Sequence, residues 1–448
     1  MGTPTSQQQP GSMRTFSIIW FGQLISALGS GLSGFALGIW IYERTASATA
    51  FSVIVLAFML PGVFFSPVAG ALVDRWNRRT ILILCDTVAA LGSLIMFILL
   101  LNGALQTWHL YILVFVSALA GSFQWPAFSA ATTMLVPQEH LGRAAGMSQI
   151  GEALSTLLTP ALAGFLYLSI GLEGIFLIDL VTFVFAVATM LVITIPEPER
   201  TKELQPSGKS SLWKEIRVGW DFIMARPGLL LLLLYIAAIN FGLGFTDPLY
   251  TLLFLSMGDA QQVGIAFSVL GLGSLVGTLI MSAWGGPQRR AFGVLFSGLA
   301  LGATYIFFGV RPWLWLVALA GFGRNLVLPI MLGSSQALWQ AKTPPDIQGR
   351  VFSVRRLIAQ FTSPISTLIA GPLVDNVLQP AMEPGGALAD SVGSVIGVGL
   401  GRGSALVFVA VGVFGILVTL AFLVVPKLRT VDTDIPNVEV KVRAEAAA

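Results

Sequence analysis

Twelve long apolar stretches, separated by short polar segments, run through this chain of 448 residues. A helix needs about 20 apolar residues to cross roughly 30 Å of hydrocarbon, whereas a spanning β-strand shows about ten residues of alternating character. Because the stretches are continuously apolar, they predict an all-α polytopic membrane protein. We expect spans near residues 16–41, 50–73, 80–102, 108–135, 146–170, 172–195, 228–255, 262–284, 291–310, 312–338, 351–374 and 404–426.

The composition agrees with a bilayer environment. Hydrophobic residues make up 55% of the chain and charged residues only 10%, against about a quarter charged in soluble domains. Glycine is abundant, and a run with Gly271, Gly273 and Gly277 is typical of helices that pack closely in membranes. The single cysteine, Cys85, excludes an internal disulfide and leaves no cysteine cluster for a metal.

The basic residues gather in every second gap between the spans. If the N-terminus is cytoplasmic, 21 of the 25 Lys and Arg residues lie in cytoplasmic segments, as the positive-inside rule requires. The outer gaps hold Arg44, Arg311 and Arg402, and Arg324 lies within a span. We therefore expect a multi-pass protein of a bacterial plasma membrane, the inner membrane in a Gram-negative cell, with both termini cytoplasmic. Because the cations follow the loops, nucleic acid is not an expected partner.

A long charged interruption divides the spans into six and six. We expect a tail at 1–15, a six-helix bundle at 16–195, a linker at 196–227, a second six-helix bundle at 228–426 and a tail at 427–448. In the linker, Trp213, Ile216, Trp220 and Ile223 recur at helical spacing, which predicts an amphipathic helix at the membrane surface. A partly ordered linker is the alternative.

An internal repeat relates the two bundles. Two polar turns match in sequence, one after the fourth span and one after the tenth, and Gly164 and Gly371 keep the same offset of 207 residues. Parallel repeats of this kind predict two pseudo-symmetric bundles related by an axis along the membrane normal. The matching turn residues are Pro137, Gly142, Arg143, Pro344, Gly349 and Arg350.

A short loop between the second and third spans places one acid among three cations. It comprises Gly70, Asp74, Arg75, Asn77, Arg78 and Arg79. This loop resembles the signature loop of the major facilitator superfamily, in which a second glycine usually stands where Asn77 stands here. Asn is the other residue that readily adopts a positive φ, so we expect it to serve the same turn.

The resemblance extends over most of the chain, from Ile19 to Ser353, and is closest to the drug-exporting branch related to macrolide efflux proteins, with siderophore exporters as cousins. It implies the major facilitator fold of 12 helices. It also implies that Asp74 latches the halves together on the cytoplasmic side, against the N-terminus of a helix such as the eleventh span. Two departures weaken the inference of proton coupling: Ser117 stands where exporters often carry arginine, and only Thr159-Pro160 and Gly164 remain of the antiporter signature.

Ionisable residues within spans are costly and usually face a cavity or a partner. Arg324 lies near the middle of the tenth span and is expected to anchor substrate, to take part in a proton cycle, or to pair with Asp247. Asp247, followed by Pro248, is a second candidate coupling residue or the cap of a helix break. Glu152 is either a proton acceptor or the partner of Arg143 or Arg356, and Asp179 is mainly structural.

The first, fourth, seventh and tenth spans line the central cavity in the family. An apolar compound needs aromatic walls and a few polar tethers, although any single aromatic residue more often packs in a core or faces lipid. The candidate cavity residues are Trp20, Gln23, Phe123, Gln124, Trp125, Asn240, Phe241 and Asn325.

These features together predict a secondary transporter that exports amphipathic small molecules, such as macrolide-like drugs, by proton-coupled antiport. The alternatives are a dedicated exporter of one metabolite such as a siderophore, a lipid flippase, or a membrane sensor without transport. An enzyme is not expected, because no nucleophile has a base at a recognisable spacing and no phosphate-binding loop occurs. The expected partners are the substrate and the lipid bilayer, no cofactor is expected, and the sequence leaves a monomer as the working assumption.

Overall fold

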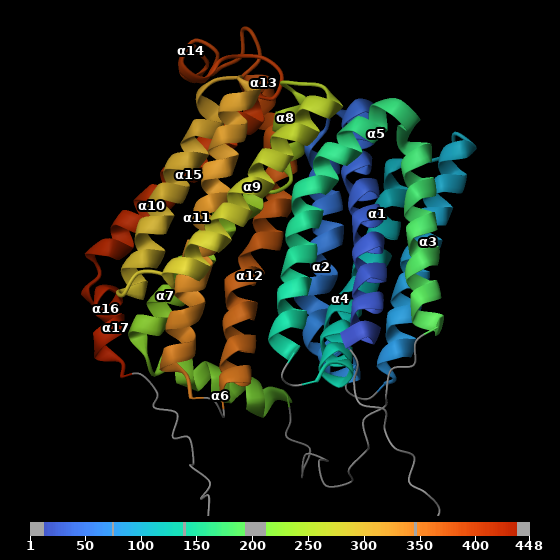
Figure 1. The fold of residues 1–448 in the computed structure, drawn as a ribbon. Coiled ribbons are helices and arrows are strands. Elements are labelled where there is room, and N and C mark those ends of the chain that lie inside the picture. The colour runs from blue at the N-terminus through green and yellow to red at the C-terminus, as the bar shows by residue number, and fades with distance from the viewer. Residues whose placement is uncertain (1–12, 74–75, 138–139, 193–211, 345–346, 437–448) are drawn as a thin grey trace, which may run out of the picture.

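Long helices dominate the computed structural model, which describes residues 13–73, 76–137, 140–192, 212–344 and 347–436 (Figure 1). No strand occurs within these ranges. The longer helices are α1 Met13–Thr45, α2 Ala48–Val73, α3 Arg78–Leu101, α4 Thr107–Leu135, α5 Leu141–Val192, α6 Leu212–Met224, α7 Pro227–Thr246, α9 Ala260–Trp284, α10 Arg290–Val310, α11 Leu314–Lys342, α12 Gln348–Leu373 and α15 Arg402–Val424. The short ones are α8 Leu249–Leu255, η3 Val374–Leu378, α13 Gln379–Ala381, α14 Val392–Ile396, α16 Pro426–Arg429 and α17 Val431–Asp434.

Twelve membrane crossings follow from these helices. Among the described residues, 11 helices are long and apolar enough to cross a bilayer. One of them, α5, has 52 residues and contains a non-helical glycine, Gly171, with φ 69° and ψ −177°. At about 1.5 Å per residue, its length is more than twice the hydrocarbon thickness. It therefore makes two crossings, as the predicted spans 146–170 and 172–195 require.

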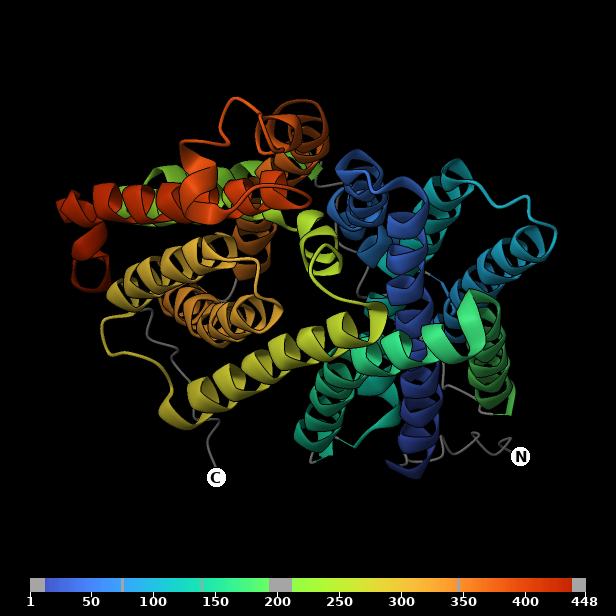
Figure 2. The same ribbon diagram turned by 90° about the horizontal axis from the view of Figure 1, so that it is seen from above.

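The helices form two groups that lie side by side (Figure 2). We call α1 to α5 the N-half and α7 to α17 the C-half. Helix α6 lies across one end of the molecule, which we call the α6 end; α14 lies at the opposite end, the α14 end (Figure 1). The amphipathic helix expected near 213–223 is present as α6, with Phe222 and Ile223 buried and Trp220 exposed. The preceding residues, 193–211, lie outside the described part of the chain.

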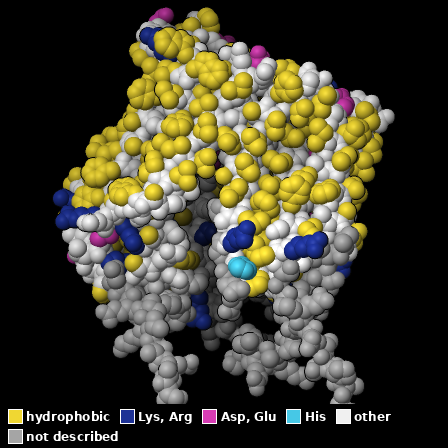
Figure 3. Space-filling view, in the orientation of Figure 1, with side chains coloured by type: hydrophobic (Ala, Val, Ile, Leu, Met, Phe, Trp, Pro, Cys, Tyr) yellow, Lys and Arg dark blue, Asp and Glu magenta, His cyan; other side chains and the backbone are white. Residues whose placement is uncertain are grey.

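The outer surface is apolar along the length of the helices. Large hydrophobic side chains such as Phe58, Leu191 and Val424 are well exposed, and Figure 3 shows such side chains spread over the visible face between the two ends. In water this surface would be a large apolar patch, but in a bilayer it faces hydrocarbon. The packed interior therefore lies within and between the two halves.

Small residues bring α9 and α11 close together. A Cβ atom at Gly273 would lie 2.3 Å from the Phe322 carbonyl oxygen, and one at Gly277 would lie 2.2 Å from the Leu326 carbonyl oxygen. Neither backbone can move aside easily. The close packing expected of this glycine-rich run is therefore present.

Candidate functional site

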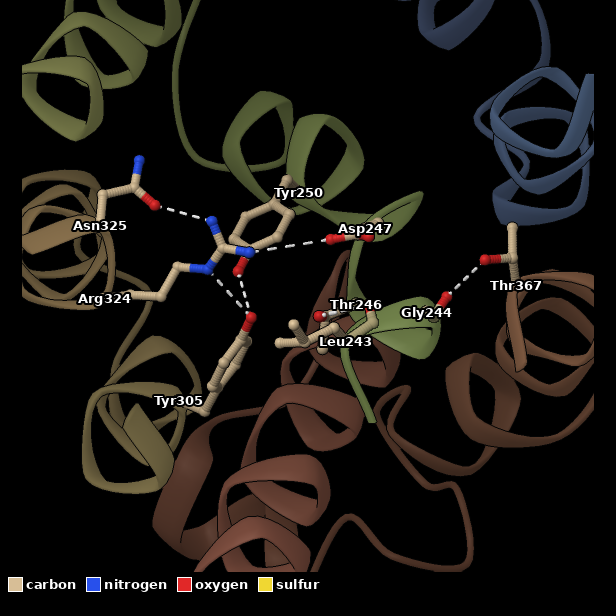
Figure 4. Close-up of polar contacts among 9 residues, drawn as sticks. All are labelled: Leu243, Gly244, Thr246, Asp247, Tyr250, Tyr305, Arg324, Asn325 and Thr367. Atoms are coloured by element: carbon tan, nitrogen blue, oxygen red, sulfur yellow. Dashed lines mark hydrogen bonds and ion pairs between the residues drawn. The ribbon is translucent and has the colours of Figure 1, made fainter. Parts of the chain in front are cut away.

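The predicted seventh span is broken between α7 and α8, at Asp247 and Pro248. Pro248 has no backbone N–H, so it cannot continue the hydrogen-bond ladder of α7. Asp247 is the C-cap residue of α7, and its N–H donates to the Leu243 carbonyl oxygen at 2.9 Å. The break places the Asp247 side chain towards α11 (Figure 4).

Arg324 of α11 lies at the centre of a polar cluster in the C-half (Figure 4). Its Nε donates to Tyr305 Oη at 3.0 Å and its Nη1 donates to Asn325 Oδ1 at 2.7 Å. Its Nη2 lies 3.9 Å from Asp247 Oδ1, so the ion pair expected as one of the alternatives is formed. Arg324 lies about 15 Å along α11, near the middle of a bilayer.

Aromatic side chains fix this cluster in place. The Arg324 guanidinium lies 5.3 Å from the centre of the Tyr250 ring, and Tyr250 Oη donates to Tyr305 Oη at 2.9 Å. The rings of Phe308 and Phe408 pack against both tyrosines. Because these rings are buried, the guanidinium has few alternative positions.

The two charged groups of the cluster are unequally accessible. The Asp247 side chain is 37% exposed, whereas that of Arg324 is 15% exposed. The pair as a whole carries no net charge, which lowers its cost inside the membrane.

A second polar cluster lies in the N-half and includes a residue that sequence reasoning missed. Asp86 of α3 is 1% exposed. Gln23 Nε2 of α1 donates to Asp86 Oδ2 at 2.9 Å, and Gln124 Nε2 of α4 donates to Asp86 Oδ1 at 2.7 Å. The same Gln124 nitrogen donates to Gln23 Oε1 at 3.0 Å, which closes a ring of three side chains. We call these three residues the amide ring.

Asp179 is buried inside the N-half, as expected of a structural residue, with 1% exposure. Its carboxylate accepts hydrogen bonds from Ser93 Oγ at 2.8 Å and from Ser30 Oγ at 3.3 Å. These bonds join three crossings of the same half.

Glu152 has an exposed side chain on α5. Among the described residues it forms no ion pair with Arg143 or Arg356, the two partners proposed for it, and Arg356 instead faces Gln360. Glu152 therefore does not belong to either polar cluster.

The candidate cavity residues fall into separate groups. Gln23 and Gln124 meet in the amide ring, and Asn325 joins the Arg324 cluster while donating to the Leu270 carbonyl oxygen at 2.9 Å. Several of the others pack elsewhere: Trp20 lies beside Gly151, Phe123 packs against the N-half core, Trp125 is 63% exposed, Asn240 donates to the Ala359 carbonyl oxygen at 2.8 Å, and Phe241 packs on Phe245 and Phe414.

Asn77 does not adopt the positive φ that Asn tolerates. Its φ is −67° and its ψ is 118°, and its side chain accepts a hydrogen bond from the Thr80 N–H at 3.2 Å. An N-cap residue needs an extended backbone to place its side-chain oxygen over the first turn, so the cap of α3 decides the conformation here. Arg79 donates to the carbonyl oxygens of Met190 and Leu191. Asp74 and Arg75 lie outside the described residues, and Gly70 lies in the last turn of α2.

The repeated turns share one hydrogen bond at equivalent positions. The His140 N–H donates to the Pro137 carbonyl oxygen at 2.8 Å, and the Ile347 N–H donates to the Pro344 carbonyl oxygen at 3.2 Å. Both bonds close a turn immediately before a long helix at the α6 end.

The halves meet at the α14 end through Asp375, which follows α12. Its carboxylate accepts hydrogen bonds from Ser47 Oγ at 2.6 Å and from the backbone N–H groups of Ala48 and Thr49, each at 2.9 Å. These N–H groups belong to the first residues of α2, where no carbonyl oxygen of the same helix is available to accept from them. A carboxylate of the C-half thus caps a helix of the N-half.

Glycines bring the backbones of the two halves together at the same end. A Cβ atom at Gly164 of α5 would lie 2.4 Å from the Ala260 carbonyl oxygen of α9, and one at Gly264 would lie 2.3 Å from the Pro160 carbonyl oxygen. Gly371 of α12 lies equally close to the first residues of α2. The two glycines related by the repeat, Gly164 and Gly371, therefore occupy equivalent contacts with the opposite half.

We expect the change Gly164→Ala to loosen this closed end, because overpacking a close backbone contact costs about 1–3 kcal/mol. The reporter is Thr251→Cys in a chain that also carries Cys85→Ala; Thr251 lies beside Gly38, between the halves. The readout is the rate at which a membrane-impermeant maleimide labels this cysteine. Labelling should be faster in Gly164→Ala. The control is Gly34→Ala, where a Cβ would meet nothing within 4 Å. Equal labelling of both variants would contradict the prediction.

At the α6 end the halves separate. Figure 3 shows a cleft between them that opens at this end, with Lys and Arg side chains on its walls. The structure is therefore closed at the α14 end and open at the α6 end.

Two helical bundles of this kind, joined by an interface that opens on one side, define the class of membrane transporters that work by alternating access. Residues 19–367 match the Major Facilitator Superfamily, so the chain belongs to that family. The resemblance to the superfamily and its 12-helix fold, inferred from the signature loop, is thereby confirmed.

Several of the similar proteins are efflux transporters. The chain is 29% identical over 369 residues to macrolide efflux protein A of Streptococcus pyogenes, covering 81% of this chain and 90% of that protein. It is 30% identical to macrolide efflux protein A of Enterococcus faecalis, covering 71% and 99%, and 23% identical to multidrug efflux pump Tap of Mycolicibacterium fortuitum, covering 80% and 88%. The expected likeness to the drug-exporting branch is confirmed.

Solved structures show the same fold. A bacterial homologue of the human lysosomal transporter Spinster, in an inward-facing and unoccupied conformation, superposes with a TM-score of 0.69 at 14% identity and covers 94% of this chain and 98% of its own. The nucleoside transporter NupG superposes with a TM-score of 0.65 at 12% identity, covering 92% of this chain and 98% of its own.

Proposed function

We propose that this protein exports amphipathic small molecules, macrolide-like compounds among them, from the cytoplasm by alternating access coupled to proton entry. The observation that carries the proposal is the asymmetry of the two ends. The halves are sealed at the α14 end by Asp375 and Gly164, and they diverge at the α6 end. The efflux relatives at about 29% identity support outward movement.

The proposed orientation places the α6 end in the cytoplasm. The loops at that end hold most of the Lys and Arg residues, which cytoplasmic loops retain. The present arrangement then faces inward, and a compound from the cytoplasm or the inner leaflet reaches the Arg324 cluster through the open cleft.

The accessibility of the cluster favours one substrate class. Because Asp247 is more exposed than Arg324, a substrate with a protonated amine meets a carboxylate. An anionic ligand would instead have to take Arg324 from Asp247, Tyr305 and Asn325. This arrangement supports an amine-bearing amphipathic compound over an anionic metabolite such as a siderophore.

The first test measures accumulation of radiolabelled erythromycin in cells that express the protein, with and without a protonophore. We expect accumulation to fall severalfold, and the protonophore to abolish the difference from cells without the protein. Accumulation that is unchanged at equal expression would contradict macrolide export. A reduction that persists with the protonophore would contradict proton coupling alone.

A further inference from the structure

Among the described residues, the carboxylate buried in the amide ring forms no ion pair. Asp86 lies at membrane depth in α3, and within the described residues its hydrogen-bond partners are the neutral amides of Gln23 and Gln124. An ionised carboxylate removed from water costs several kcal/mol, and two neutral hydrogen bonds recover only part of that cost. Asp247 differs in this respect, because the guanidinium of Arg324 lies beside it.

Other charged and titratable groups lie on the helices packed around Asp86. Arg78 begins α3 about 12 Å before it, and the Arg78 Nε is buried without a hydrogen-bond partner among the described residues. Cys85 precedes it in α3 and is buried. Asp179 on the packed helix α5 is bonded to serine hydroxyls, and Arg79 at the start of α3 is bonded to carbonyl oxygens of α5. Gln124 is the polar contact from α4, and Gln23 is the one from α1. The amide ring is therefore the immediate environment of Asp86.

The ring accommodates Asp86 with or without a proton. As a carboxylate, Asp86 accepts from both amides. When Asp86 is protonated, its O–H needs a hydrogen-bond acceptor. Rotation of either glutamine amide by 180° would place the amide oxygen where the nitrogen was, with little change in the shape of the side chain. Gln23 and Gln124 are only partly buried, on helices that line the cavity in this family. Their orientation thus links the protonation of Asp86 to the surface that a substrate touches.

We propose that Asp86 carries the coupled proton in the N-half, and that Gln23 and Gln124 transmit its protonation to the substrate cavity. One O–H bond forms on the carboxylate from the outer side, and the same bond breaks on the cytoplasmic side, so one proton moves inward and no other group changes. Substrate bound against the two amides favours the orientation that suits the carboxylate, and the proton leaves. This inference rests on the proposed antiport and assigns its proton site.

The test uses purified full-length protein in liposomes and radiolabelled erythromycin. Two quantities are measured. The first is the accumulation of erythromycin driven by an acidic lumen, which is the part that nigericin abolishes after the uptake by protein-free liposomes is subtracted. The second is the exchange of labelled for unlabelled erythromycin when the pH is equal on both sides. Exchange needs binding and the conformational change but no net proton movement. A variant that has lost only the proton site retains it.

We expect Asp86→Asn to lower gradient-driven accumulation about tenfold or more while exchange stays within about threefold of wild type. Asp86→Glu, which restores an acid, should recover accumulation. The matched control is Asp179→Asn, a second buried acid of the same half, which should leave accumulation intact. If Asp86→Asn does not reach the membrane, Asp86→Ser is the second variant without a titrating group.

Two outcomes overturn the inference without touching the proposed function: gradient-driven accumulation that survives in Asp86→Asn, or accumulation and exchange that fall together, which would mark a structural role. A wild-type protein that exchanges erythromycin but ignores the pH gradient overturns the proton coupling itself, and this inference with it.

Discussion

The change Arg324→Gln is expected to reduce transport of erythromycin about tenfold or more. It leaves the Asp247 carboxylate without the guanidinium that lies 3.9 Å away. It also removes the guanidinium N–H groups that donate hydrogen bonds to Tyr305 and Asn325. Breaking a fully buried pair costs about 3–5 kcal/mol, but Asp247 is 37% exposed, so solvent reduces the cost to about 1–2 kcal/mol. The measurement is transport in liposomes together with the thermal unfolding midpoint in detergent.

A double-substituted chain separates charge from packing. Arg324→Gln combined with Asp247→Asn removes both charges, so it should be more stable than Arg324→Gln alone, with a coupling energy of about 1 kcal/mol or more. The control Arg311→Gln changes an exposed arginine that precedes α11 and should leave transport and stability near wild type. If Arg324→Gln transports as well as Arg311→Gln, the cluster has no part in the transport cycle.

The crossings were predictable from the sequence, because the length and continuity of an apolar run are set by the thickness of the bilayer. The break in the seventh span was also visible, since Pro248 cannot donate to the preceding turn. The backbone conformation of Asn77 was not predicted. Its tolerance of positive φ was considered, but capping of α3 by its side chain determined the outcome.

Asp86 and Asp375 were missed for different reasons. Asp86 lies only six residues into the predicted span 80–102, close to the arginines of the preceding loop, so its position alone does not distinguish a buried acid from an interfacial one. The signal that was available is that Gln23 and Gln124 are polar residues inside two other spans. Asp375 lies just beyond a predicted span and its partner Ala48 is 327 residues away in sequence, a pairing that no local pattern encodes.

The change Asp375→Ala is expected to shift the protein towards an arrangement open at the α14 end. It removes three hydrogen bonds and a negative charge from the N-terminus of α2. Loss of an N-cap costs about 0.5–2 kcal/mol, and loss of a charge at a helix N-terminus adds about 0.3–1 kcal/mol. Because these contacts join the two halves, the cost falls on the closed arrangement, and about 1.4 kcal/mol changes the ratio of the two states tenfold.

The readout is maleimide labelling of the cysteine at Thr251 in intact cells, which should be about tenfold faster in Asp375→Ala. Asp390→Ala is the matched control, because Asp390 is an exposed acid of the same connecting segment. Labelling that does not differ between the two variants would show that the capping contact does not hold this end closed. Faster labelling from outside the cell would also support the proposed orientation, since the reagent reaches only that side.

The source of the cap explains why Asp375 can act between the halves. Helix α9, which starts at the other interhalf contact, is capped by its own Asp259, whose side chain accepts from the Gln262 N–H at 2.8 Å. Helix α2 instead takes its carboxylate from the end of α12, so its cap is lost when the halves part. Since α2 and α12 run in opposite directions, the C-terminal end of α2 and the N-terminus of α12 are both at the α6 end, where the halves are apart in this structure. In the sequence, Asp74 follows α2 as Asp375 follows α12, and the latch predicted for Asp74 would cap α12 in the opposite state by the same physical means.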